Sequence, residues 1–133
     1  MGNVYAELTL RNADDLTLAK KGYITNENVR EETVNALVDT GAWTLVVNGE
    51  IQEKLGLEVQ GDDSVTLANG VTQSVKITGP VQVQWKDRKM ICQPILIPEA
   101  DEVLLGAIPL EDMNLIVDPR NEIVVGRKKL RRL

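Results

Sequence analysis

Three consecutive residues, Asp39, Thr40 and Gly41, lie directly between two apolar segments, residues 36–38 and 45–47. Apolar segments of this length predict buried strands. A carboxylate beside buried strands is unfavourable unless it is hydrogen-bonded or shares a proton, which points to acid–base chemistry at Asp39. The same three residues also fit an ordinary turn between two strands, because Asp and Gly are common turn formers.

Other kinds of catalytic site are limited by the composition. The sequence has no histidine, which excludes a Ser-His or Cys-His nucleophilic pair and the usual His-containing zinc site. The single cysteine, Cys92, lies in an apolar segment, which favours a buried, inert thiol over a nucleophile. Carboxylates are the remaining acid–base groups for a hydrolase, and we expect neither a cofactor nor a bound metal.

The length and the apolar content indicate one soluble globular domain. The chain has 133 residues, of which 43% are hydrophobic and 26% are charged, and a chain of this size buries a core without disulfides. No apolar segment approaches the ~18–20 residues of a membrane helix. The N-terminal residues also lack the pattern of a signal peptide. We therefore predict a cytoplasmic protein with no membrane partner.

Charge is unevenly distributed along the chain. The net charge is −5, and five basic residues fall in residues 127–133, so residues 1–126 carry −10. An acidic domain argues against nucleic acid as a partner. The charge boundary predicts a single domain over residues 1–126 and a basic C-terminal tail over residues 127–133. We expect the tail to be solvated, with contact to phosphate or an acidic surface as the alternative.

Alternating apolar and polar residues predict a mostly antiparallel β domain. A strong hairpin-turn signal, Asn69-Gly70, separates two of the predicted strands. Residues 11–15 form a polar break, and we expect a loop over residues 16–28. The predicted strands are residues 4–10, 29–38, a return strand starting at residues 57–59, and residues 65–68, 73–77, 81–85, 90–97, 103–105, 115–118 and 122–125.

One or two short helices complete the expected fold. Residues 50–55 have helical spacing, with Asn48 as N-cap and Gly56 as C-cap. Pro109 fits the first turn of a second helix over residues 110–113. The fold class is therefore all-β, mainly antiparallel, with a closed, barrel-like sheet that leaves few exposed edges.

The order of these features resembles the retroviral-type (retropepsin-like) aspartic proteases, and more closely their small single-domain bacterial relatives. The resemblance covers about residues 29–118. It consists of a strand ending in Asp-Thr-Gly-Ala, a glycine-tipped hairpin, and a later Leu-Leu-Gly element before a short helix. It implies an acid-protease fold.

The resemblance also implies a role for each residue of the Asp-Thr-Gly-Ala segment. Asp39 matches the catalytic aspartate. Thr40 matches the threonine whose hydroxyl braces the paired loops of a dimer. Gly41 matches the glycine whose backbone lies against the substrate, and Ala42 matches the small residue beside it.

Two further elements of the family have counterparts in this sequence. Residues 65–77 match the hairpin that forms a flap over the substrate. The positions that match the flap tip are Asn69, Gly70 and Val71. The positions that match the element behind the catalytic loop are Leu104, Leu105 and Gly106.

The chain departs from the viral pattern at Trp43 and Ala107. Viral members usually carry an acid at the first position and an arginine at the second, and these form an ion pair between the active-site loop and the following helix. Both partners are replaced here, which avoids an unpaired buried charge. We expect Trp43 to pack over Ala107 in place of the ion pair.

A single Asp-Thr-Gly implies a site shared between two chains. Asp118 also follows an apolar segment, but it lacks a following Thr-Gly and is expected to be a turn residue. The second catalytic carboxylate is therefore expected from Asp39 of a twofold-related copy, so the predicted partner is a second copy of this chain. Residues 4–10 and 115–125 are the expected dimer elements.

The predicted function is that of an aspartic endopeptidase, active as a homodimer on a peptide or protein substrate. Val46, Val47, Val71 and Ile108 are expected to form apolar pocket walls. One alternative is a non-catalytic dimeric peptide-binding module, in which Trp43 narrows the cleft. Another is a β-barrel domain with an accidental Asp-Thr-Gly turn.

Overall fold

The computed structural model describes residues 2–66 and 69–127, and within these it contains eleven strands and three α-helices. The strands are β1 (Tyr5–Asn12), β2 (Glu31–Val38), β3 (Val46–Val47), β4 (Val59–Thr66), β5 (Thr72–Thr78), β6 (Val81–Trp85), β7 (Arg88–Cys92), β8 (Ile95–Leu96), β9 (Leu104–Leu105), β10 (Leu115–Asp118) and β11 (Ile123–Gly126). The helices are α1 (Ala13–Lys20), α2 (Gly49–Leu55), α3 (Ala107–Asp112) and the 3₁₀ turn η1 (Asn26–Asn28).

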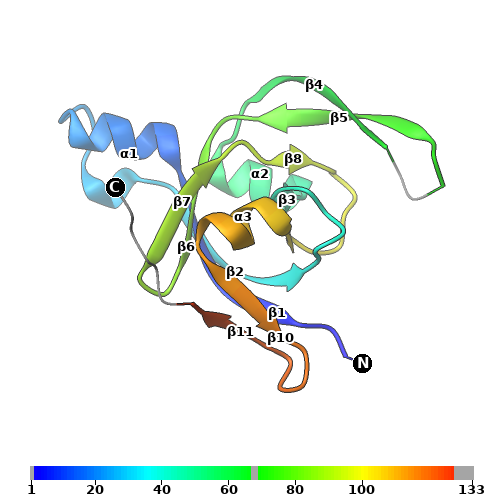
Figure 1. The fold of residues 1–133 in the computed structure, drawn as a ribbon. Coiled ribbons are helices and arrows are strands. Elements are labelled where there is room, and N and C mark those ends of the chain that lie inside the picture. Colours follow the sequence, from blue (N-terminus) through cyan, green and yellow to red (C-terminus); the bar gives the residue numbers. More distant parts are fainter. Residues whose placement is uncertain (1, 67–68, 128–133) are drawn as a thin grey trace, which may run out of the picture.

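Nine of the described strands form one sheet, in the order β4-β5-β8-β3-β9-β2-β1-β6-β7. The sheet curls into a half-barrel, and the β4–β5 hairpin reaches out from it (Figure 1). Two neighbouring pairs, β2 with β9 and β3 with β8, are parallel, while the other neighbours are antiparallel. The predicted fold class, mainly antiparallel β structure with short helices, is confirmed.

The core lies inside the curled sheet and is closed by α2 and α3. Along β1 the buried Ala6, Leu8 and Leu10 alternate with more exposed residues, as a strand with one solvated face requires. Ile51 and Leu55 of α2 and Leu110 of α3 pack into the same apolar cluster. Among the described residues, no helix combines the length and the apolar character needed to cross a bilayer.

The predicted caps of α2 are confirmed. The Asn48 side-chain oxygen accepts a hydrogen bond of 3.0 Å from the Ile51 backbone N–H. Gly56 ends the helix in the left-handed region at φ 61°, which costs glycine little. The second predicted helix is also present as α3, but it begins at Ala107 rather than at residue 110.

Helix α1 occupies residues 13–20, where a polar break and the first part of a loop were predicted, so that part of the prediction was wrong, while residues 21–28 form turns and η1. The helix has no apolar stripe, because its buried residues are only Ala13 and Asp15. It is held instead by polar contacts of the buried Asn12. The Asn12 side chain accepts from the Asp15 N–H at 3.0 Å and donates to the Leu55 carbonyl at 2.8 Å, which ties α1 to the end of α2.

Asp15 and Arg30 form a partly buried ion pair behind α1. Arg30 Nε and Nη2 donate to the two carboxylate oxygens at 2.8 and 2.9 Å, and the Arg30 backbone N–H donates at 3.1 Å. The Asp15 side chain is 7% exposed. The hydrogen bonds from Arg30 lower the pKa of Asp15 below its ordinary value, against the opposing effect of burial.

Two predicted strand boundaries were wrong. The strand predicted over residues 90–97 is divided into β7, which pairs with β6, and β8, which pairs with β3 and β5. Pro94 lies in the gap and has no N–H to donate to a ladder. Strand β4 spans Val59–Thr66, so the return strand predicted to start at residues 57–59 and the strand predicted from residue 65 are one strand, and residues 67 and 68 lie outside the described residues.

The terminal strands, which were predicted as dimer elements, differ in how they pair within the chain. β1 is paired with β2 along residues 5–11 and with β6 along residues 9–12, so its second half lies inside the sheet and is not free for a partner chain. β10 and β11 form a separate hairpin. Residues 128–133 lie outside the described residues, so the basic tail stays a prediction.

Asp15→Asn is expected to lower the free energy of unfolding by about 2 kcal/mol at pH 7, because charge-assisted hydrogen bonds of this kind contribute that much. The folded-state pKa of Asp15 is lowered. Its stabilisation is therefore complete above the unfolded pKa of about 3.9 and is lost as the pH falls through the lower folded pKa. Urea unfolding at pH 7 and at pH 3 measures this difference.

Asp62→Asn is the control for this experiment. Asp62 pairs with Lys76, but both side chains are more than half exposed, so its loss is expected to change stability by less than about 1 kcal/mol. An Asp15→Asn effect of the same size at both pH values would contradict the assignment.

Candidate active site

Asp39 directly follows β2 and is held by its backbone at the end of the sheet. Leu37 and Val38 of β2 pair in parallel with Leu104 and Leu105 of β9. The Asp39 N–H continues this ladder by donating to the Leu105 carbonyl at 3.0 Å. The position of Asp39 is therefore fixed by two of the buried strands of the sheet.

A tight turn directs the Asp39 carboxylate. The Ala42 N–H donates to the Asp39 carbonyl at 3.0 Å, and the Gly41 N–H donates to the side-chain oxygen Oδ1 at 2.9 Å. A Cβ atom at residue 41 would lie 3.1 Å from that same oxygen. The lack of a side chain at Gly41 therefore gives its N–H room to approach the carboxylate. Thr40 is exposed beside it.

Gly106 and the start of α3 support this turn from behind. The Ala107 and Ile108 N–H groups donate to the carbonyls of Ala42 and Trp43, each at 2.9 Å. The first N–H groups of a helix have no partner within the helix, and here the Asp39 loop provides two of their acceptors. The helix and the loop therefore satisfy each other's backbone polar groups.

The backing element allows this contact because residue 106 has no side chain. A Cβ atom at Gly106 would lie 2.3 Å from the Thr44 carbonyl oxygen and 2.7 Å from the Ala42 carbonyl oxygen. Both neighbours are backbone atoms that cannot move aside cheaply. The Leu104-Leu105-Gly106 element and the Asp39 loop are thus brought together in the structure.

The expected packing of Trp43 over Ala107 stays a prediction. Both residues line one shallow hollow, and Trp43 is 72% exposed. Backbone hydrogen bonds join the loop to α3. The indole is left available on the same side of the loop as the β4–β5 hairpin, whose Ser64 and Val65 line two hollows together with Trp43.

The β4–β5 hairpin stands beyond this loop. Its turn contains Gly70 in the left-handed region at φ 82°, and the Asn69 side-chain oxygen accepts from the Val71 N–H at 3.0 Å. Asn69, Gly70 and Val71 are exposed, and none of these three is among the residues that line the hollow beside Gly41. The described stem of the hairpin, rather than its tip, lines that hollow.

The hollow beside the Asp39 loop has a volume of about 460 Å³. Its walls are mainly apolar, which suits the side chain of an extended peptide. The lining includes Gly41, Ala42, Val46, Val65, Val75 and Leu104.

The residues predicted as pocket walls do not all line the same hollow. Val46 lines the hollow beside Gly41, and Ile108 lines the shallow one beside Thr40. Val47 is completely buried in the core, so its prediction as a wall was wrong. Ile95 and Ile97 line the first hollow but were not identified from the sequence, although they flank the buried Leu96 with a strand's alternation.

Cys92 and Asp118 are two other side chains with reactive groups, and their surroundings explain their protonation behaviour. Burial raises the pKa of the Cys92 thiol to about 11, which keeps it protonated near neutral pH. Asp118 ends β10, and its carboxylate accepts hydrogen bonds from the Asn121 N–H at 3.2 Å and from the Asn121 side chain at 2.8 Å. These bonds lower the pKa of Asp118 and identify it as a turn residue.

The curled sheet, the Asp39 loop and the hairpin beyond it define the retropepsin-like aspartic protease fold. The model of the family described as gag-polyprotein putative aspartyl protease matches residues 25–126. The chain therefore belongs to that family. A comparison with curated protein sequences found no match.

Two solved structures share the fold. The retroviral protease-like domain of Ddi1 from Leishmania major has 16% sequence identity and a TM-score of 0.57, over 94% of this chain and 88% of that one. The EIAV protease complexed with the inhibitor HBY-793 has 18% identity and a TM-score of 0.52, over 84% of this chain and 88% of that one. At these identities the two structures establish the fold alone.

Gly106→Ala is expected to displace the Asp39 loop, because the new Cβ would overlap two backbone carbonyls. We expect a loss of more than about 3 kcal/mol in the free energy of unfolding, measured by urea titration. Gly61→Ala is the matched control, since a Cβ atom at residue 61 meets nothing within 4 Å. Equal stability of the two variants would show that the loop does not depend on residue 106.

Proposed function

We propose that the protein is an aspartic endopeptidase whose active site forms between two copies of the chain. The observation that carries the proposal is the position of Asp39. It stands on a turn fixed by Leu105 and by the start of α3, and its half-buried carboxylate receives the Gly41 N–H. Gly41, the hairpin stem and the apolar hollow lie beside it, where an extended peptide would run.

The proposed chemistry requires a second carboxylate. Two aspartates about 3 Å apart cannot both ionise, so the pair shares one proton. The ionised carboxylate takes a proton from a water molecule, whose oxygen attacks the carbonyl carbon of the scissile bond. The protonated carboxylate gives its proton to the carbonyl oxygen, which forms a gem-diol. The other carboxylate then passes the proton that it took from water to the nitrogen, and the C–N bond breaks. A gem-diol hydroxyl returns a proton to the dyad as the product carboxyl group forms.

The partner copy is proposed to meet this chain near the start of β1. The Val4 carbonyl accepts a hydrogen bond of 2.8 Å from the Val38 N–H, so the N-terminal segment runs beside the residue that precedes Asp39. The separate β10–β11 hairpin has exposed Ile116 and Ile123 side chains. These elements supply apolar and backbone groups at the end of the sheet where two Asp39 residues would have to meet.

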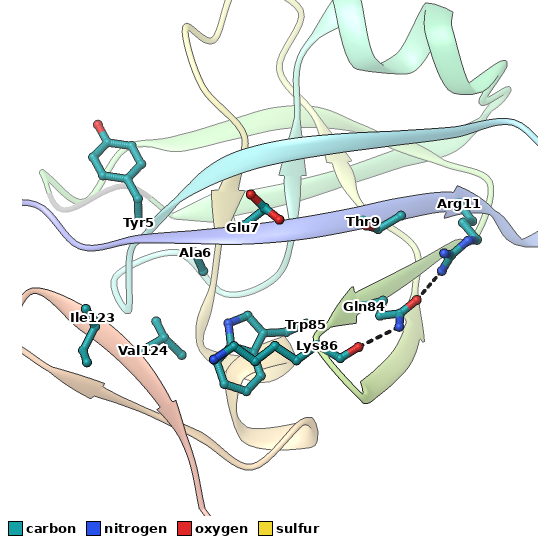
Figure 2. A pocket seen from close by; sticks show the side chains of 10 residues that line it. All are labelled: Tyr5, Ala6, Glu7, Thr9, Arg11, Gln84, Trp85, Lys86, Ile123 and Val124. Atoms are coloured by element: carbon teal, nitrogen blue, oxygen red, sulfur yellow. Dashed lines mark hydrogen bonds between the residues drawn. The ribbon is translucent and has the colours of Figure 1, made fainter.

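Figure 2 shows the same region from close by. The side chains drawn line a hollow of about 490 Å³ between β1, the end of β6 and β11, with Tyr5 and Ile123 among them. β6 pairs with β1 only from Thr9 onward, so the edge of β1 facing this hollow has no β6 partner over residues 5–8. This edge is the part of β1 that remains suited to a dimer contact.

Asp39→Asn is expected to abolish peptide cleavage, with kcat/KM reduced by at least about 10³-fold, because the amide cannot act as the general base. Fluorogenic peptides assayed at mildly acid pH measure this loss, and thermal unfolding checks that the variant is folded. Asp87→Asn is the control, since Asp87 is an exposed residue in the turn between β6 and β7. Activity that survives in Asp39→Asn would refute the catalytic assignment.

Mixing experiments test whether the two carboxylates come from two chains. When wild type is exchanged with an equal amount of Asp39→Asn, random pairing halves the number of wild-type dimers, so activity is expected to fall to about one half. Unchanged activity after complete subunit exchange would show that one chain is sufficient.

A non-catalytic peptide-binding module is the second candidate function, and the exposed Trp43 ring beside the loop supports it. Incubation with a peptide library, with and without a transition-state-type aspartic protease inhibitor, separates the two functions. Inhibitor-sensitive cleavage supports the protease. Peptide binding without any cleavage supports the module.

A further inference from the structure

The two acidic residues in the middle of β4 lie on opposite faces of the β4–β5 hairpin. Asp62 is opposite Lys76 and Asp63 is opposite Val75 in the antiparallel register. Directly opposed residues point to the same face of a sheet, while successive residues alternate. Val75 is 7% exposed, so its face, which is also the face of Asp63, is turned toward the body of the protein.

Asp62 and Asp63 differ in the partners of their carboxylates. Asp62 forms an ion pair with Lys76 at 2.6 Å on the outer face. Asp63 accepts a hydrogen bond from the Ser64 backbone N–H at 2.8 Å, and within residues 2–66 and 69–127 it has no cationic partner. One carboxylate is thus left without a counter-charge on the inward face.

Asp62 and Asp63 both line a hollow of about 660 Å³ under the hairpin stem, and of the two only Asp62 has a cationic partner among the described residues. The Trp43 ring, 72% exposed, is another wall of this hollow, and Val65, Ile77 and Ile95 supply apolar surface. The hollow shares Trp43, Val65 and Ile95 with the one beside Gly41. A peptide that passes Asp39 would therefore place a nearby side chain in the Asp63 hollow.

Building on the proposed protease function, we propose that this hollow is a subsite for a lysine or arginine side chain of the substrate, and that Asp63 and Trp43 determine this specificity. The apolar walls suit the methylene stem of a long basic side chain. The exposed indole offers its face to the cation, and the Asp63 carboxylate provides the opposite charge and hydrogen-bond acceptors.

The overall charge of the protein also favours a basic substrate. Residues 1–126 carry a net charge of −10, which favours the approach of a basic peptide over an acidic one. Because Asp63 is exposed, its part of the preference is expected to weaken as the ionic strength rises.

A library of ten-residue peptides tests the proposal, with one position at a time occupied by arginine or by citrulline, its neutral isostere. Cleavage is measured with the wild-type protein, and binding is measured by capture on the Asp39→Asn variant, which does not depend on catalysis. We expect a preference for arginine of about tenfold at one position, from the combined contributions of the ring and the carboxylate. Asp63→Asn is expected to reduce it to about twofold, because only the ring contribution then remains.

Asp87→Asn is the control, because it removes one negative charge from the exposed turn between β6 and β7, outside the hollow, and should keep the wild-type preference. The subsite is refuted if arginine and citrulline are equivalent at every position, or if Asp63→Asn keeps the full preference. Cleavage without a preference contradicts the subsite and leaves the protease intact. A preference in binding without cleavage supports the subsite and contradicts the protease.

Discussion

The backbone contact between the Asp39 loop and the start of α3 is the constraint on which the rest of the site depends. Asp39 is anchored to Leu105 on one side, while the carbonyls of Ala42 and Trp43 accept the first N–H groups of the helix on the other. Gly106 permits the approach because a side chain there would overlap the loop backbone. Trp43 and Ala107 stand at the two positions that an acid and an arginine would occupy in the viral pattern, and main-chain hydrogen bonds join the loop and the helix here.

This substitution has a consequence for the surface around the site. The Trp43 residue is 72% exposed and lines two hollows beneath the β4–β5 hairpin. One of them is also lined by Asp63, which has no cationic partner within residues 2–66 and 69–127. In our proposals, the chemistry at Asp39 and the recognition of a basic side chain belong to neighbouring but separate groups.

Much of the fold was predictable from short-range patterns. The alternation in β1, the caps Asn48 and Gly56 and the turn at Asn69-Gly70 each express a local preference of the backbone, and each appears in the structure. Helix α1 was not predictable in this way, because it has no apolar stripe and depends on the contact of Asp15 with Arg30, fifteen positions further along the chain. The division of residues 90–97 likewise depends on distant partners, β3 and β5.

The same distinction between local sequence patterns and contacts of distant residues applies to the candidate site. Sequence spacing selected Asp39, Thr40 and Gly41 because they form a contiguous motif, and the structure places them in one turn, while their roles stay predictions. The exposure of Trp43 and the inward face of Asp63 required the register of the sheet and the packing of the loop, which no local pattern specifies. Val47 shows the opposite error, because an apolar residue near the motif was assigned to a pocket although it belongs to the core.

The most direct measurement of a shared Asp39 site is the stoichiometry with which a tight transition-state-type aspartic protease inhibitor binds, determined by isothermal titration calorimetry on the assembled protein. A site made from two Asp39 carboxylates on a twofold axis predicts one inhibitor molecule for every two chains. Binding of one inhibitor per chain, or binding that persists unchanged in the Asp39→Asn variant, would contradict it.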